Sequence, residues 1–227
     1  MTAMTKPFMQ ASRDPHSETA GFSLLELLLA LSLGIGLSGA ILQLLISESD
    51  VGLRVNRLLR ERSVQQRTIA LIRDDVQRSS HISANPQFEH HACSLAGRLP
   101  VLHLSTAAGP ITYSVGNAPS AIWRGQVLMR CGPAFDLAGQ PSVASSAQNR
   151  VVIDGLAVNP EPWRGCSRMI TMGVDSPVDL SASAKSSFSA CLGNEGSLLS
   201  IRLMEQFSGT ANHLQWISSE ALISMMP

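Results

Sequence analysis

The residues with the most evident chemical capacity are three histidines and a cysteine close together in the sequence: His90, His91, Cys93 and His103. Imidazole and thiolate groups bind transition metals, and a thiolate beside a histidine can act as a nucleophile. The cluster follows a loop signal, Asn85-Pro86, and no helical or strand spacing directs its side chains to one point. No P-loop, zinc-protease helix or nucleophile elbow is present. We therefore expect no metal, no cofactor and no enzymatic activity.

A single acid inside a long apolar segment is the second candidate. Between Phe22 and Ile46 the only ionisable side chain is Glu26. Roughly 20 apolar residues cross a bilayer as a helix, and a carboxylate at the membrane centre costs on the order of 2.5–3.5 kcal/mol. The segment is predicted to span a membrane, and Glu26 is predicted to have a partner there.

The apolar segment also has three simpler interpretations: a secretory signal peptide, a plain membrane anchor and a buried helix of a soluble protein. A secretory signal peptide carries its small-residue cleavage site after a short apolar core, whereas here the small residues precede a long one. A plain membrane anchor accounts for the length of the segment but not for its acid. A buried helix of a soluble protein is rarely apolar on all sides for seven turns.

Four cysteines follow the apolar segment: Cys93, Cys131, Cys166 and Cys191. In an exported domain an even number of cysteines predicts two disulfide bonds. Three pairings are open, and we favour Cys93–Cys131 with Cys166–Cys191 because each bond would close a long local loop. A structural zinc site is the alternative, but the chain has no C-x-x-C pair.

These residues must be positioned by a long helix followed by strands. A stripe with a period of 3.6 residues continues the apolar segment, and charged residues occupy the opposite face. The stripe comprises Val51, Val55, Leu58, Ile69, Ile72 and Val76, interrupted by Arg62 and Gln65. The charged face comprises Arg54, Arg57, Arg60, Glu61, Arg67, Arg73, Asp74 and Arg78. We interpret that face as solvated or as a subunit contact, rather than as a phosphate site.

Beyond His81 the pattern changes to short apolar runs between turn residues. Strands are predicted at residues 99–104, 111–115, 127–129, 151–153, 198–204 and 213–217, and loops at 136–149 and 176–189. The run Ile111–Val115 alternates as a half-buried antiparallel strand does. The net charge of zero and the aromatic content of 4% argue against a nucleic-acid partner.

The start of the apolar segment resembles the type IV pilin superfamily. The resemblance is carried by Gly21, Phe22, Ser23, Leu24, Leu25 and Glu26, followed by the apolar run. The run from Arg67 to Gln77 is similar to the helix end of W-type minor pilins and J-type pseudopilins, which tend to carry an acid where Asp74 stands.

The resemblance implies a fold, a processing step and a set of partners. The fold would be a pilin-like α+β arrangement: a leader (1–21), a membrane or filament-core helix (22–46), its soluble continuation (47–80) and a β-rich exported domain (81–227). A prepilin peptidase would cleave between Gly21 and Phe22 and N-methylate Phe22. Glu26 would pair with the Phe22 amine of a neighbouring subunit. Partners would be other pilins, an inner-membrane assembly platform and lipid.

Three functions remain open at this point: a minor pilin of a type IV pilus, a pseudopilin of a type II secretion system, or an exported binding domain on a plain anchor. The resemblance places the leader in the cytoplasm and the domain in the periplasm. Four arginines oppose this orientation, because positive residues beside a membrane helix favour the cytoplasmic side. They are Arg54, Arg57, Arg60 and Arg62. The cysteines favour export, and we expect the periplasmic orientation.

Overall fold

The structure, a computed structural model, describes residues 23–143, 145–181, 183, 185–193, 196–208 and 214–225, without side chains for residues 45–51 and 54. The chain divides into two compact units, Met1–Gly52 and Leu53–Pro227. A continuous helix, α1 (Leu24–Gln77), contributes to both units. The predicted leader, with Gly21 and Phe22, lies outside the described residues.

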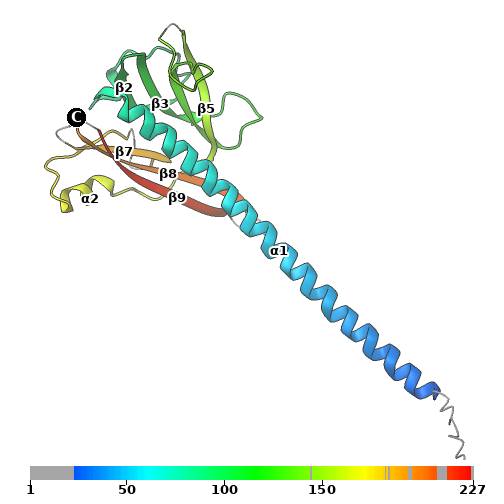
Figure 1. Cartoon of the computed structure of the whole chain (residues 1–227). Helices are drawn as coiled ribbons and strands as arrows, with labels where there is room; N and C mark the ends of the chain where they lie inside the picture. Colours follow the sequence, from blue (N-terminus) through cyan, green and yellow to red (C-terminus); the bar gives the residue numbers. More distant parts are fainter. Residues whose placement is uncertain are drawn as a thin grey trace, which may run out of the picture. The chain divides into compact units, whose positions relative to one another are not determined.

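The second unit is built on one antiparallel sheet, which makes the fold α+β (Figure 1). A 3-10 turn, η1 (Pro86–Phe88), and a short helix, α2 (Gly165–Thr171), accompany the sheet. The strands are β1 (Ser79–Ile82), β2 (Leu99–Thr106), β3 (Gly109–Asn117), β4 (Gln126–Pro133), β5 (Ala147–Leu156), β6 (Val178–Asp179), β7 (Phe188–Leu192), β8 (Leu198–Ser208) and β9 (Leu214–Ser224).

The sheet curls at β8, where its order branches. Strands β1 to β5 follow one another, and β5 then meets β8 at a single pair, Leu156 with Glu205. Further along the same edge β8 pairs with β7, while its other edge pairs with β9 along the whole of both strands. Two sections of sheet therefore share β8, and their inner faces enclose one apolar core.

The outer part of α1 packs its apolar stripe into that core. Ile69, Ile72 and Val76 are buried together with Leu104, Tyr113 and Phe188 from three strands. The predicted stripe is wrong at its start, because Val55 is 46% exposed. Burial on the helix begins further along, where the partly buried Val64 contacts the core.

Several predicted boundaries need correction. Each predicted strand lies within an observed one, except that His213 is outside the described residues. The predicted loop 136–149 ends where β5 begins at Ala147, and the predicted loop 176–189 contains β6 and the start of β7. The helix ends at Gln77, so residues 79 and 80 of its predicted soluble part belong to β1. Strands β1, β6 and β7, the 3-10 turn η1 and helix α2 were not predicted.

The alternating run in β3 is also buried more than expected. All residues from Ile111 to Val115 are buried, on both faces of the strand. One face meets the core, and the segment after η1 covers the other, where His91 contacts Thr112 and Cys93 is bonded to Cys131. Alternation predicted the inner face correctly, but it could not show that a loop covers the outer face.

Candidate functional site

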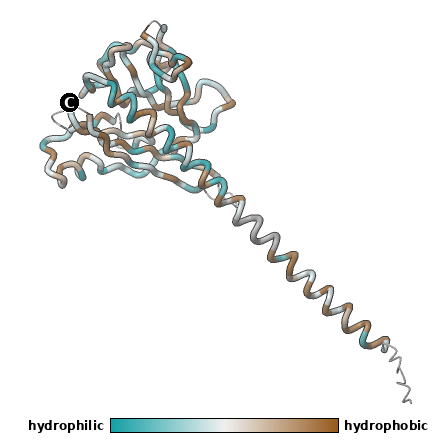
Figure 2. Tube along the Cα trace, in the orientation of Figure 1, coloured by the Kyte–Doolittle hydropathy of each residue, from teal (hydrophilic) through white to brown (hydrophobic). Residues whose placement is uncertain are grey.

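The apolar segment of α1 presents an uncovered hydrophobic surface. Residues Leu24–Leu44 have a mean hydropathy of 2.0, and none of the segment is buried within the chain. Figure 2 shows this stretch mainly in brown, the colour of hydrophobic residues. Twenty-one residues are enough to cross a hydrocarbon core. An exposed apolar surface of this kind is typical of segments that contact lipid or other helices.

Glu26 stands in the first turn of this helix and has a local role that the sequence analysis missed. The Ser23 hydroxyl accepts a hydrogen bond from the Glu26 backbone N–H at 3.2 Å. Serine at the cap and glutamate three residues later form the sequence pattern of a capping box. The positive end of the helix dipole also favours an acid at this position. The carboxylate is exposed, so it remains available to a partner outside the chain.

The four cysteines form two disulfide bonds, in the pairing that the loop argument favoured. Cys93 is bonded to Cys131 with their Cα atoms 5.9 Å apart, and Cys166 to Cys191 with theirs 5.5 Å apart. The first bond ties the segment after η1 to β4, and the second ties α2 to β7. Cys93 is therefore unavailable as a metal ligand or nucleophile.

The histidine cluster is brought together in part, around a threonine. The Nδ1 atoms of His91 and His103 lie 3.2 and 2.9 Å from the Thr112 hydroxyl, while His90 is exposed. A hydroxyl donates one hydrogen bond, so Thr112 can serve as donor to only one ring. Burial lowers the pKa of both imidazoles, which favours their neutral forms. Within the described residues, no three histidine, cysteine or acidic side chains are placed to hold a metal ion.

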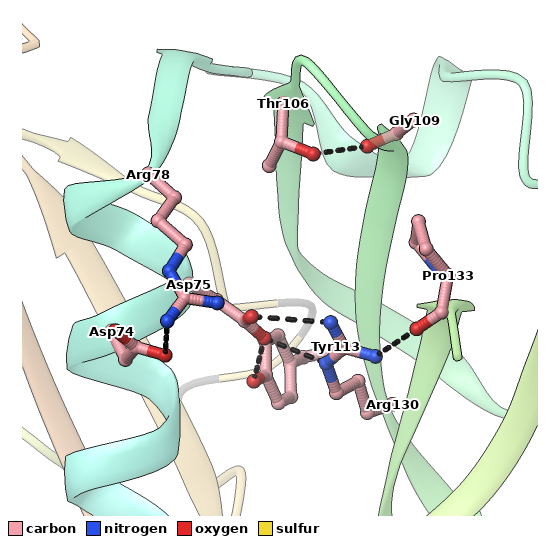
Figure 3. A network of polar contacts seen from close by, with 8 residues as sticks. All are labelled: Asp74, Asp75, Arg78, Thr106, Gly109, Tyr113, Arg130 and Pro133. Carbon is pink, nitrogen blue, oxygen red and sulfur yellow. Dashed lines mark hydrogen bonds and ion pairs between the residues drawn. The ribbon is translucent and has the colours of Figure 1, made fainter. Parts of the chain in front are cut away.

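A buried ion pair fastens the end of α1 to the sheet (Figure 3). Asp75 is fully buried and accepts hydrogen bonds from Arg130 Nε at 2.7 Å, Arg130 Nη2 at 3.1 Å and the Tyr113 hydroxyl at 2.5 Å. The remaining Arg130 nitrogen donates to the Pro133 carbonyl at 3.1 Å. Burial, followed by the charge of Asp75, raises the pKa of Tyr113 well above its ordinary value. Every charged atom in this cluster has a partner.

A second buried acid is much less well paired. Glu205 on β8 is 3% exposed, and its Oε2 atom has no hydrogen-bond partner among the described residues. Burial raises the pKa of Glu205 to about 7. The charges of Glu61 and Asp154 act in the same direction, whereas Gln65 and Arg124 oppose the shift. Arg124 lies 3.6 Å from Glu61 and 3.4 Å from Asp154, so two other acids already share the positive charge that opposes the shift.

The arginine-rich face of α1 is mostly solvated, as expected, with two corrections. Glu61 is only 12% exposed and faces Arg124 rather than open solvent. Arg57 donates to the Ser208 carbonyl at 2.7 Å, which links the helix to the end of β8. Asp74, the acid suggested by the resemblance, forms a partly exposed pair with Arg78, and the buried acid is its neighbour Asp75.

Sequence reasoning missed Asp75, Tyr113, Arg130 and Glu205. One signal was present: Asp75 lies between Ile72 and Val76, within the apolar stripe, where an acid needs a buried partner. Nothing local in the sequence marks Arg130 as that partner, since it lies 55 residues away. Comparisons with models of protein families, with curated proteins and with solved structures each found no match. The function is therefore inferred from the chain's own residues.

Proposed function

We propose that the protein is a minor pilin, a structural or priming subunit of a type IV pilus that is processed by a prepilin peptidase. One observation carries the proposal: an apolar helical segment of 21 residues, uncovered within the chain, has a single acid in its first turn. The residues before and around that acid resemble the pilin processing site. In a filament of such helices, the apolar surface would be buried against the helices of neighbouring subunits.

Assembly would be driven by burial of the apolar segment among other helices. In the membrane the segment is surrounded by lipid, so close packing and polar contacts would select the filament arrangement. Glu26 would pair with the N-terminal amine of a neighbouring subunit. Two unit charges 4 Å apart attract by about 4 kcal/mol at an effective dielectric near 20. The pair would offset the desolvation of both groups and set the axial register between subunits.

The disulfide bonds support the proposed location of the second unit. Both bonds lie in Leu53–Pro227 and join residues of the folded domain. Structural disulfides persist in the periplasm and outside the cell, and are rare in the cytosol. A single membrane-spanning helix followed by an oxidised domain fits a pilin precursor whose leader is cytoplasmic.

Processing provides the first test. We expect the mature chain extracted from membranes to begin at Phe22 and to carry one additional methyl group on its amine. Intact mass measurement distinguishes this form from the precursor by the mass of residues 1–21. A mature protein that keeps residues 1–21 in cells with an active prepilin peptidase would contradict the proposal.

The proposed charge pairing of Glu26 with a neighbouring subunit can be separated from its contribution to the helix cap. Glu26→Gln removes the charge but keeps a side chain that suits a capping box, whereas Ser23→Ala removes the cap and keeps the charge. We expect Glu26→Gln to reduce the ratio of protein in sheared filaments to protein in the membrane, and Ser23→Ala to leave this ratio nearly unchanged. If Ser23→Ala reduced this ratio and Glu26→Gln did not, Glu26 would act only in helix capping.

A further inference from the structure

Strand β9 forms an open edge of the sheet. It pairs with β8 over its full length of 11 residues, and no described strand pairs with its other edge. It contains no proline and no lysine, and its register with β8 has no bulge. Folded proteins usually protect such edges, because free N–H and C=O groups attract other strands. The end strands β1 and β6 are short, with four and two residues.

The direction of the free backbone groups follows from the neighbouring hydrogen bonds. Met204 directs its N–H to the Ser187 carbonyl and its C=O to the Ala157 N–H, on the edge of β8 away from β9. Its neighbours in β8, Leu203 and Glu205, therefore direct their backbone groups to their β9 partners. It follows that the intervening β9 residues, Ser218, Glu220 and Leu222, direct their N–H and C=O groups to the open edge.

A groove runs along this edge between the helix and the strand. Its walls are Gln66, Ile69, Ala70 and Arg73 of α1 and residues 219–222 of β9, and its volume is about 600 Å³. The α1 wall is apolar in its middle and has a positive charge at Arg73. Arg73 is exposed and forms no salt bridge with the described residues. The one acid in the groove lining, Glu220, pairs with Arg168 and Trp163 instead.

We propose that this groove binds an extended acidic segment of a partner protein, which adds to the sheet as a strand beside β9. Its backbone would pair with Ser218, Glu220 and Leu222. One set of alternate side chains would enter the groove, where a carboxylate would meet Arg73. The other set would lie beside Trp216 and Leu222, apolar side chains that are 49% and 47% exposed on the opposite face of β9. Backbone pairing supplies affinity in such complexes, and side chains supply specificity.

Synthetic peptides test the proposal on the full chain in detergent micelles. The probe is a short acetylated and amidated peptide in which glutamate alternates with valine, and the control peptide has lysine in place of glutamate. We expect the glutamate peptide to slow amide hydrogen exchange at Ser218, Glu220 and Leu222, and to bind more tightly than the lysine peptide. Ser218→Pro should abolish the protection, since proline removes an outward N–H without removing a bond to β8.

A charge exchange tests the role of Arg73 directly. Arg73→Glu should weaken the glutamate peptide about tenfold and reverse the preference between the two peptides. Arg67→Glu is the matched control, because Arg67 is exposed on the same helix but does not line the groove. Failure of both peptides to slow exchange, or an unchanged preference in Arg73→Glu, would overturn the proposal. If these amides were protected without any peptide, and more strongly at higher protein concentration, the strand that binds this edge would come from a second copy of the chain instead of an acidic partner. None of these results bears on cleavage at Gly21.

Discussion

Two buried carboxylates in the second unit, Asp75 and Glu205, have opposite surroundings. Asp75 accepts three hydrogen bonds, two of them from a buried arginine that is itself fully paired. Glu205 is almost as deeply buried, yet one of its oxygens has no hydrogen-bond partner among the described residues, and the positive charge of Arg124 that acts on it is shared with two other acids. The sequence does not predict this contrast, because Arg130, the partner of Asp75, lies 55 residues away from it.

The difference shows two ways in which a fold can accommodate a buried acid. At Asp75 the fold supplies a buried arginine and a tyrosine hydroxyl as hydrogen-bond donors, so the cluster fastens α1 to β3 and β4. At Glu205 the fold instead favours the protonated form, and its pKa is raised to about 7. The first cluster should therefore be sensitive to mutation, and the second to pH.

Removing the charge of Asp75 should have the largest effect. Asp75→Asn leaves Arg130 buried without a counter-charge, and breaking one side of such a pair costs about 3–5 kcal/mol. Urea unfolding of the detergent-solubilised full chain, followed by tryptophan fluorescence, measures the loss, since all three tryptophans lie in the second unit. Asp74→Asn is the control, because its pair with Arg78 is partly exposed to solvent and should contribute about 1 kcal/mol or less. Equal losses in the two variants would refute the contrast.

Glu205 should make the second unit less stable as the pH rises. Between pH 4.5 and about 7 the folded protein keeps a proton that the unfolded chain releases, so the free energy of unfolding falls across this interval. The full decrease is about 3 kcal/mol, reached above pH 7. Glu205→Gln cannot ionise, and at pH 8 we expect this variant to be more stable than the wild type.

The pH dependence is read from the difference between Glu205→Gln and wild type, measured by urea unfolding from pH 4.5 to 8.5. This subtraction cancels the contributions of the other titrating groups. Glu161→Gln serves as the matched control, because Glu161 is an exposed residue of the same type. A constant difference across the range would mean that Glu205 titrates normally in the folded protein.

Tyr113→Phe should have a smaller effect than Asp75→Asn within the same cluster. It removes the hydroxyl that donates to Asp75 Oδ2, while both hydrogen bonds from Arg130 remain. Loss of one buried hydrogen bond to a charged group costs about 1.5–3 kcal/mol, and the ring still fills its site. Urea unfolding followed by tryptophan fluorescence, as for Asp75→Asn, measures this loss of stability. A loss as large as that of Asp75→Asn would show that the hydroxyl, rather than the arginine, is the main partner of Asp75.

Periodicity predicted much of the fold, because each prediction depended on residues close together in the sequence. The apolar run and the stripe through Ile69, Ile72 and Val76 indicated one long helix, and short apolar runs located most strands. Strands β1 and β6 and helix α2 escaped notice because they are short and lack an apolar pattern: Ser79–Ile82 contains two serines and a histidine. Strand β7, Phe188–Leu192, was missed because its first two residues lie in the predicted loop 176–189. The branching of the sheet at β8 depends on pairings distant in sequence, which no local pattern records.

The candidate site was predictable to the extent that it is local. Glu26 was singled out as the only ionisable residue in the apolar segment, and the loop-closure argument favoured the observed disulfide pairing among three that the sequence left open. The partners of Asp75 and Glu205 depend on tertiary contacts, with Arg130 and Arg124 brought from distant strands and loops. The same limitation applied to the histidines, whose meeting at Thr112 depends on the pairing of β2 with β3.

The smallest expected effect concerns Arg124, the positive charge that Glu205 shares with Glu61 and Asp154. Arg124 is 61% exposed, so its ion pairs should contribute less than about 1 kcal/mol to stability. Its charge nevertheless lowers the pKa of Glu205, against the larger effect of burial. In Arg124→Gln we therefore expect little change in stability at pH 5, where Glu205 is mostly protonated. The Glu205-dependent decrease in stability should still begin near pH 4.5, but it should extend to higher pH and become larger, because the charge of Arg124 no longer lowers the pKa of Glu205 in the folded protein. Comparing Arg124→Gln with Arg124→Gln/Glu205→Gln from pH 4.5 to 8.5 isolates this shift. A decrease that ends at the same pH as in the wild type, or at a lower pH, would mean that Arg124 does not act on Glu205 through its charge.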